Sequence, residues 1–209
     1  MNPEAISSPV TGHGAGAPSD WVRRWSHLVR PGGEVLDVAC GQGRHTRWFA
    51  GRGHPVTAVD RDAAALSTLA AGTAGTAPVT VLQADLEQAP WPLPGRRFEA
   101  VVVTHYLWRP LWPALLDSLA PGGLYLHETF AAGQETVGRP SRPAFLLQPG
   151  ELLTACAGLR IVAFEDGFLD HPPRFVQRIA AIRPDPQIPG PARHGLGPPA
   201  PPPAPGPER

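Results

Sequence analysis

The segment Asp37-Val-Ala-Cys-Gly41-Gln-Gly43 holds the residues whose types and spacing most directly indicate chemistry. Gly41 and Gly43 can adopt positive φ angles in a tight turn, and they let the backbone approach a ligand that a Cβ would repel. The turn follows a predicted strand and opens a predicted helix, which is where open α/β sheets bind nucleotides. The sequence therefore predicts a nucleotide-binding loop.

Two further aspartates end the next two predicted strands, so that three carboxylates line one edge of the sheet. Asp60 can accept hydrogen bonds from both hydroxyls of a ribose, and Asp85 from the exocyclic amine of adenine. Asp37 would attract an ammonium group of the same ligand. Each has a structural alternative, because Asp37 can hold the loop by accepting backbone N–H bonds, and Asp60 and Asp85 can cap helices.

The residue type at position 46 distinguishes between two classes of cofactor-binding loop. The dinucleotide-binding fingerprint G-x-G-x-x-G requires a third glycine at the position that Thr46 occupies. A pyrophosphate also gains nothing from the carboxylate of Asp37 on the strand, whereas a cationic ligand does. A dinucleotide-dependent oxidoreductase is therefore the less favoured alternative.

Four segments resemble, in order, the motifs of the class I S-adenosylmethionine-dependent methyltransferases: VLDVACGQG (35–43), AVDRD (58–62), QADLE (83–87) and LAPGGLYL (119–126). The stretch 41–60 is also similar to the tellurite-resistance type. The resemblance extends from about Trp21 to Arg183. It implies an enzyme that transfers a methyl group from S-adenosylmethionine to a small molecule.

The resemblance also assigns the cofactor contacts. It implies that the two glycines of the loop contact the methionine moiety, that Asp60 binds the ribose, and that Asp85 and the Leu86 backbone bind the adenine. Arg61 either lies over the adenine or extends into solvent. A protein that retained the fold without catalysis would bind the same cofactor, so a sensor or scaffold is a second alternative.

Methyl transfer from a sulfonium is a direct displacement, in which alignment and exclusion of water matter more than a general base. The acceptor is expected above the ends of the fourth and fifth strands. There His105 is the candidate base and Tyr106 a candidate wall of the methyl channel, and a structural histidine and a core tyrosine are the alternatives. THYL (104–107) stands where nucleobase amine methyltransferases usually carry Asn/Asp-Pro-Pro-aromatic, which argues against methylation of DNA.

A long segment, residues 130–152, follows the fifth predicted strand. Loops of this length without regular structure are often functional, and this one is expected to close over the acceptor pocket. Glu135 and Arg139 within it, and Glu128 before it, are the candidate substrate-side residues. His127 and Glu128 point to opposite faces of a strand, so no metal site is predicted.

Short apolar runs alternate with helical stretches between residues 19 and 183, which predicts one doubly wound, Rossmann-like α/β domain. Helices are expected from Ser19 and near 44–52, 62–71, 111–119 and 149–158. The predicted strands are 34–40, 55–60, 78–85, 98–105, 124–130, 159–168 and 174–183. Their mostly continuous apolar character indicates a parallel sheet covered on both faces. The short loop between the last two strands makes them antiparallel neighbours.

The two ends of the chain differ in composition from this domain. Residues 1–18 read as a flexible leader, and residues 184–209 contain 11 Pro and 4 Gly, which predicts a disordered or polyproline-like tail. The tail is either a ligand for a proline-binding domain or a solvated extension.

Charge and cysteine content limit the partners and the compartment. All 18 basic residues are Arg and they balance 18 acidic residues, so there is no basic excess for duplex nucleic acid. A Lys-free composition is typical of a bacterial, GC-rich genome. With only Cys40 and Cys156 no disulfide framework is needed, and no apolar run is long enough to span a membrane. We expect a cytoplasmic protein.

Overall fold

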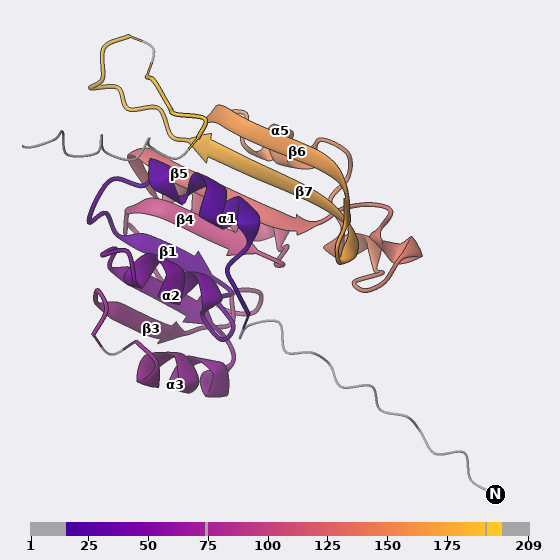
Figure 1. Cartoon of the computed structure of the whole chain (residues 1–209), viewed down its shortest axis with the longest axis horizontal. Coiled ribbons are helices and arrows are strands. Elements are labelled where there is room, and N and C mark those ends of the chain that lie inside the picture. The colour runs from indigo at the N-terminus through magenta and orange to yellow at the C-terminus, as the bar shows by residue number, and fades with distance from the viewer. Residues whose placement is uncertain (1–15, 74, 191, 198–209) are drawn as a thin grey trace, which may run out of the picture.

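Seven strands form a single sheet with the order β3-β2-β1-β4-β5-β7-β6 in the computed structural model, which describes residues 16–73, 75–190 and 192–197 (Figure 1). β7 runs antiparallel to both of its neighbours, and the other pairs are parallel. The predicted sheet with its antiparallel last strand is confirmed. The strands are β1 (Val35–Val38), β2 (Val56–Asp60), β3 (Val79–Gln83), β4 (Phe98–Thr104), β5 (Leu119–Phe130), β6 (Arg160–Asp170) and β7 (Pro173–Ile182).

Five helices connect the strands, and most are shorter than the sequence predicts: α1 (Asp20–Trp25), α2 (Arg44–Ala50), α3 (Ala63–Ala71), α4 (Trp112–Asp117) and α5 (Glu151–Ala155). The first helix starts where predicted because the Ser19 side chain accepts a hydrogen bond from the Trp21 backbone N–H. It then changes to a 3₁₀ turn at Ser26–Leu28. The expected helix at 111–119 is cut short because β5 already begins at Leu119.

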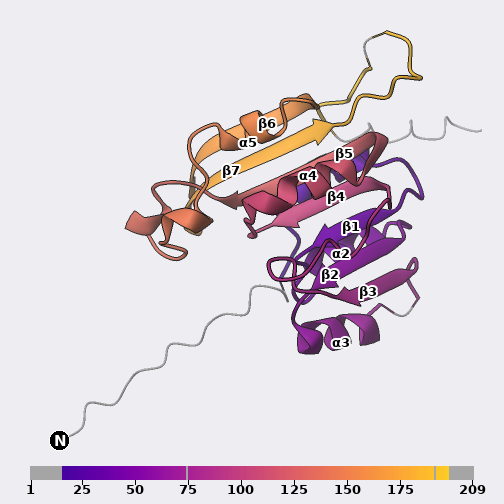
Figure 2. The same cartoon turned by 180° about the vertical axis from the view of Figure 1, so that it is seen from behind.

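Two apolar cores lie on the two faces of the sheet. Alternate residues of β4 point to opposite sides, so Ala100 and Val102 pack with α1 and α2, whereas Val101 and Val103 pack with α4 and α5. Figure 1 shows α1 and α2 in front of the sheet, and Figure 2 shows α4 from behind. Trp21 fixes α1 on the sheet through a hydrogen bond from its Nε1 to the Ile179 carbonyl of β7, 3.1 Å away.

β3 departs from the expectation that every strand is covered on both faces. Three of its five residues are exposed, including Val81 at 36%. The chain between β3 and β4 is rich in proline and glycine and forms no helix, so nothing packs over the outer face of this edge strand. Both faces of the sheet are therefore covered at β1, β4 and β5, but one face stays exposed at β3.

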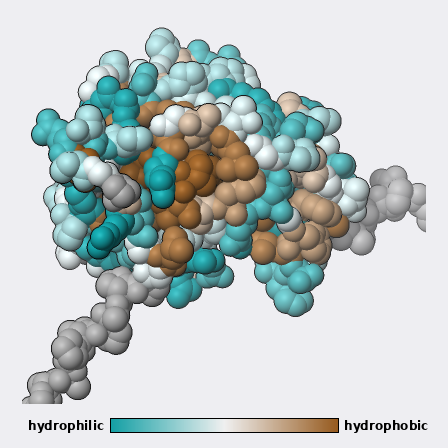
Figure 3. Space-filling model, turned by 90° about the horizontal axis from the view of Figure 1, so that it is seen from above, coloured by the Kyte–Doolittle hydropathy of each residue, from teal (hydrophilic) through white to brown (hydrophobic). Residues whose placement is uncertain are grey.

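The described segment after β7 runs along one side of the molecule without helix or strand. Apolar side chains gather on this side, which Figure 3 shows from above. Within it Ile188 is 51% exposed and Leu196 is 68% exposed. The predicted leader lies outside the described residues except for 16–18, and so does the end of the predicted tail from residue 198 on. Among the helices that the structure describes, none is both long and apolar enough to cross a bilayer.

Candidate active site

The loop after β1 takes the strained turn that its glycines predicted. Ala39, Gly41 and Gly43 have φ angles of 52°, 54° and 76°. A Cβ on Gly43 would lie 2.3 Å from Cδ1 of Leu69, so a larger residue would push α2 away from α3. The sequence predicted close approach of a ligand at this glycine. The structure adds helix packing as a second reason for it.

Asp37 lies beneath this loop and is 1% exposed. It accepts a hydrogen bond of 2.6 Å from the hydroxyl of Thr46, the residue that stands in place of the third fingerprint glycine. Burial raises the pKa of the Asp37 carboxyl to about 6, and the Thr46 hydrogen bond opposes that rise. Asp37 thus holds α2 to β1 through both the hydroxyl and the backbone N–H of Thr46, so the structural alternative of a backbone N–H bond is present. Its contact with a cofactor stays a prediction.

Asp60 joins the loops after β1 and β2. One carboxylate oxygen accepts from the Gly41 N–H at 2.7 Å and the other from the Asp62 N–H at 2.9 Å. Asp62, not Asp60, caps α3. Asp85 accepts from the N–H groups of Glu87 and Gln88 in the turn that follows β3. Each carboxylate oxygen has two lone pairs, so both aspartates retain capacity for a ligand.

A cavity of about 170 Å³ opens at the carboxyl ends of β1, β2 and β3. Its lining brings together five residues that the sequence predicted: Asp60, Arg61, Asp85, Leu86 and Tyr106. We call it the adenosine cavity because it contains the two aspartates expected to bind ribose and adenine. Glu87 also lines it and was not predicted.

A second cavity of about 320 Å³ adjoins the first and shares Glu87 and Tyr106 with it. His105, Phe130 and Phe145 complete its wall. The Tyr106 hydroxyl is buried without a hydrogen-bond partner among the described residues. Burial, with the nearby carboxylates of Glu87 and Asp85, raises the pKa of Tyr106 well above its ordinary value, so it stays neutral. A neutral aromatic wall between the two cavities fits the predicted methyl channel.

A third cavity of about 570 Å³ shares His105 and Phe130 with the second and extends to the turn between β6 and β7. We call it the acceptor cavity. The predicted residues Glu128 and Arg139 line it, and so do Arg44, His171 and Arg174, which sequence reasoning missed. Glu135 lines none of the three cavities, and its carboxylate accepts from the Gly133 N–H instead. The three cavities follow the carboxyl ends of the parallel strands, the end where the segment after β5 lies in Figure 1.

His105 lies between the second cavity and the acceptor cavity with a φ of 53°, which is uncommon for a residue other than glycine. Its ring stacks on Phe130 with 5.1 Å between centroids. Nδ1 lies 3.4 Å from an Arg44 nitrogen, and because a guanidinium only donates, Nδ1 accepts. This geometry holds the histidine at the boundary of the two cavities.

Glu128 is 2% exposed and connects three parts of the chain. Its carboxylate accepts from the Ser19 hydroxyl at 3.0 Å and from Arg178 of β7 at 3.5 Å. On the other face of β5, His127 lies between the Tyr125 hydroxyl and the Tyr106 carbonyl, and burial lowers the pKa of His127 to about 4. The two side chains do not converge, and no group of three metal-ligating side chains occurs in the described part of the chain.

Comparison with known proteins shows what the chain is similar to. Residues 35–123 match the methyltransferase domain family. A malonyl-[acyl-carrier protein] O-methyltransferase from Serratia marcescens is 34% identical over 145 residues, which are 62% of this chain and 54% of that protein. The chain therefore spans about half the length of this curated relative.

Solved structures agree on the fold of the methyltransferase domain. TehB from Haemophilus influenzae superposes with a TM-score of 0.63 at 18% identity, over 76% of this chain and 60% of TehB. An S-adenosylmethionine dependent methyltransferase from Mesorhizobium loti gives a TM-score of 0.61 at 18% identity, over 76% of this chain and 95% of its own. The fold is that of the class I S-adenosylmethionine-dependent methyltransferases, and the likeness to TehB confirms the predicted resemblance to the tellurite-resistance type.

Proposed function

We propose that this protein transfers a methyl group from S-adenosylmethionine to a small molecule. The observation that carries the proposal is the row of three cavities along the carboxyl ends of the strands, with Asp60 and Asp85 at the first of them. The name of the Mesorhizobium loti neighbour supports the choice of cofactor. The predicted cytoplasmic location and bacterial origin stay predictions.

The cofactor would lie with its adenosine in the first cavity. Asp60 accepts from the ribose hydroxyls, and Asp85 with the Leu86 backbone contacts the adenine. Arg61 borders the same cavity and is exposed, so it can cover the ring from the solvent side. The methionine moiety would follow the loop of Gly41 and Gly43, and the methyl group would point past Tyr106 toward the second cavity.

The reaction is a direct displacement at the methyl carbon. The acceptor atom forms a bond to carbon while the carbon–sulfur bond breaks, and the sulfur takes the bonding electrons as S-adenosylhomocysteine forms. The protein contributes alignment and exclusion of water, because positive charge only disperses along this coordinate. An acceptor that carries a proton would release it to His105, which borders both the second cavity and the acceptor cavity.

The charges of the acceptor cavity favour an acceptor with a carboxylate or phosphate group. Arg44, Arg139 and Arg174 line it, and the buried Nε of Arg174 has no hydrogen-bond partner in the described residues. The opposing carboxylate of Glu128 is already paired with Arg178. Burial lowers the pKa of Arg44, so an anionic partner would stabilise its charge. Arg44 donates to His105 and Arg174 to the Pro172 carbonyl, but each guanidinium has five N–H donors, so donors remain for a ligand.

Transfer of labelled methyl groups from S-adenosylmethionine into a metabolite extract tests this function. The extract is divided by anion exchange before the reaction. We expect label in a product from the retained, anionic fraction. Label only in the unretained fraction would contradict the anionic acceptor, and binding of the cofactor without any transfer would favour a sensor or scaffold.

A further inference from the structure

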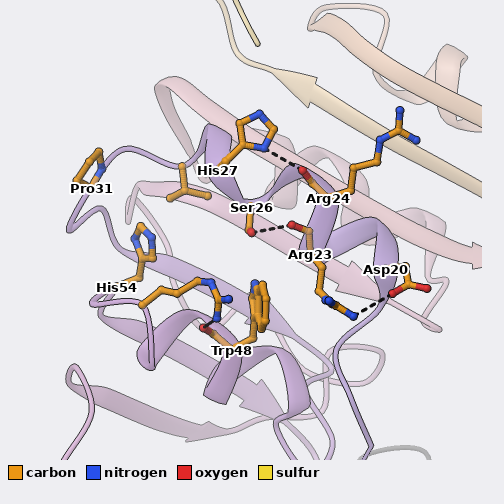
Figure 4. A pocket seen from close by; sticks show the side chains of 10 residues that line it. Asp20, Arg23, Arg24, Ser26, His27, Pro31, Trp48 and His54 are labelled. Carbon is orange, nitrogen blue, oxygen red and sulfur yellow. Dashed lines mark hydrogen bonds and ion pairs between the residues drawn. The ribbon is translucent and has the colours of Figure 1, made fainter. Parts of the chain in front are cut away.

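A further cavity lies on the face of the sheet that α1 and α2 cover, away from the adenosine cavity. A groove of about 640 Å³ runs between α1, the loop after it and the end of α2 (Figure 4). Its volume is within the range of small-molecule sites, roughly 300–1,000 Å³. Apart from Asp20, its lining shares no residue with the three cavities of the methyltransferase site.

The groove carries an excess of positive charge. Arg23, Arg24 and Arg52 line it, and Asp20 is its one acidic residue. Arg23 pairs with Asp20 at 3.4 Å, but the Asp20 side chain is 92% exposed. Arg24 pairs with Glu165 at the same distance, and the two side chains are 53% and 41% exposed. Exposed ion pairs of this length contribute little, so they leave the guanidinium groups available to a better partner.

Trp48 holds two of these cations close together. The guanidinium carbon of Arg52 lies 3.0 Å from the centre of the Trp48 ring, and that of Arg23 lies 5.8 Å away. Burial, and after it the charge of Arg23, lower the pKa of Arg52. An anion bound beside the two guanidinium groups would oppose both effects. Figure 4 shows the Arg23 side chain beside Trp48, with its guanidinium directed to Asp20.

Two histidines also line the groove, but their ring nitrogens are engaged within the chain. His27 has Nδ1 at 2.8 Å from the Arg24 carbonyl and Nε2 at 3.1 Å from the Gly195 carbonyl. His54 donates from Nδ1 to the Gly33 carbonyl at 3.0 Å. The donors that the groove offers to a ligand are therefore those of its arginines.

We propose that this groove binds the phosphate or diphosphate group of a small molecule. A guanidinium donates two parallel hydrogen bonds to phosphate oxygens, and Arg groups from α1 and from the end of α2 can hold one such group between them. The site is separate from the methyl-transfer reaction and would bind whether or not the cofactor is present.

Calorimetric titration of the full chain with sodium diphosphate, in saturating S-adenosylhomocysteine, tests the proposal. We expect binding to the wild type and about tenfold weaker binding to Arg23→Gln and, separately, to Arg52→Gln, the effect of losing one charged hydrogen-bond donor. Arg97→Gln is the matched control, because Arg97 is exposed and lines none of these sites.

Three results would overturn the proposal. Diphosphate would fail to bind the wild type at millimolar concentration, or Arg97→Gln would weaken binding as much as Arg23→Gln, which indicates a general charge effect. Alternatively, diphosphate would bind the chain without S-adenosylhomocysteine but not with it, which would place the anion in the cofactor's own site. Should Arg52→Gln not fold, Arg23→Gln still decides the question, because Arg23 is an exposed helical residue whose loss leaves the core intact.

Discussion

Asp60 already holds two loops together before any cofactor binds. Its carboxylate ties Gly41 to the start of the loop after β2, so the residue expected to contact the ribose also sets the shape of the glycine turn. The sequence predicted the ligand contact because a carboxylate at this strand end matches a known pattern. It did not predict the loop contact, because 19 positions separate the two partners and only the fold brings them together.

Asp60→Ala tests this residue. We expect the variant to bind S-adenosylhomocysteine more weakly by about 1–3 kcal/mol, since the ribose hydroxyls lose their acceptor and the loop loses its tie. Asp62→Ala is the control, because it removes the neighbouring carboxylate that caps α3 but does not line the adenosine cavity. Wild-type affinity in Asp60→Ala would show that the ribose lies elsewhere.

Asp37 predicts a specific dependence of stability on pH. Its pKa is about 6 in the folded chain against an ordinary value of 3.8, so the folded state holds the proton more tightly. The stability that this proton contributes is fully present below the unfolded pKa and is lost as the pH rises through about 6. Between about pH 4 and pH 7 the wild type should lose about 2 kcal/mol relative to Asp37→Asn, which does not titrate.

Urea denaturation of both chains at the two pH values measures that difference. The asparagine keeps a carbonyl oxygen that can accept from Thr46, so the variant is expected to fold. A difference in unfolding free energy that stays constant with pH would mean that Asp37 does not titrate in this range in the folded protein.

At the scale of elements, the strands were predictable and several contacts between segments were not. Mostly continuous apolar runs located the strands, and the reason holds best for β1, β2, β4 and β5, which are parallel and largely buried. The acceptor cavity, however, combines α2, the segment after β5 and the turn before β7. Arg44 and Arg174 lie 130 positions apart in the sequence. Neither belongs to a local sequence motif that would indicate a ligand-binding residue. The exposed outer face of β3 was missed because an apolar strand does not show whether a helix will cover it.

Gln134 fixes the segment that lines the acceptor cavity. The side chain is buried, accepts from the Phe175 N–H at 2.9 Å and donates to the Arg139 carbonyl at 3.2 Å. Gln134→Ala should therefore destabilise this segment by about 1–3 kcal/mol and speed amide hydrogen exchange in residues 131–139. Gln148→Ala is the matched control, since no side-chain hydrogen bond of the exposed Gln148 occurs in the structure. Equal exchange in the two variants would mean that Gln134 does not anchor the segment.

At the scale of the whole molecule, the methyltransferase site and the chain after β7 lie at opposite ends of the strands (Figure 1). The described part of this chain packs beside Gly122, Arg160 and Ile182, and the cavities open at the other end. The sequence predicted a boundary between the domain and this segment, because the proportion of proline rises from residue 184 on. It did not predict that the segment contacts His27 through the Gly195 carbonyl.

Removal of residues 184–209 tests this separation. We expect the shortened chain to fold and to bind S-adenosylhomocysteine as the full chain does, because none of the residues 184–190 and 192–197 that the structure describes lines the three cavities. Thermal unfolding monitored by circular dichroism, followed by titration of the cofactor product, measures both properties. Loss of the thermal transition would show that the segment is part of the core.

Titration calorimetry of the full chain with S-adenosylhomocysteine, and in parallel with NAD, tests the central claim most directly. The cavity at Asp60 and Asp85, with Thr46 in place of a third glycine, predicts one binding site for S-adenosylhomocysteine and none for NAD. A folded chain that binds NAD but not S-adenosylhomocysteine would contradict the account.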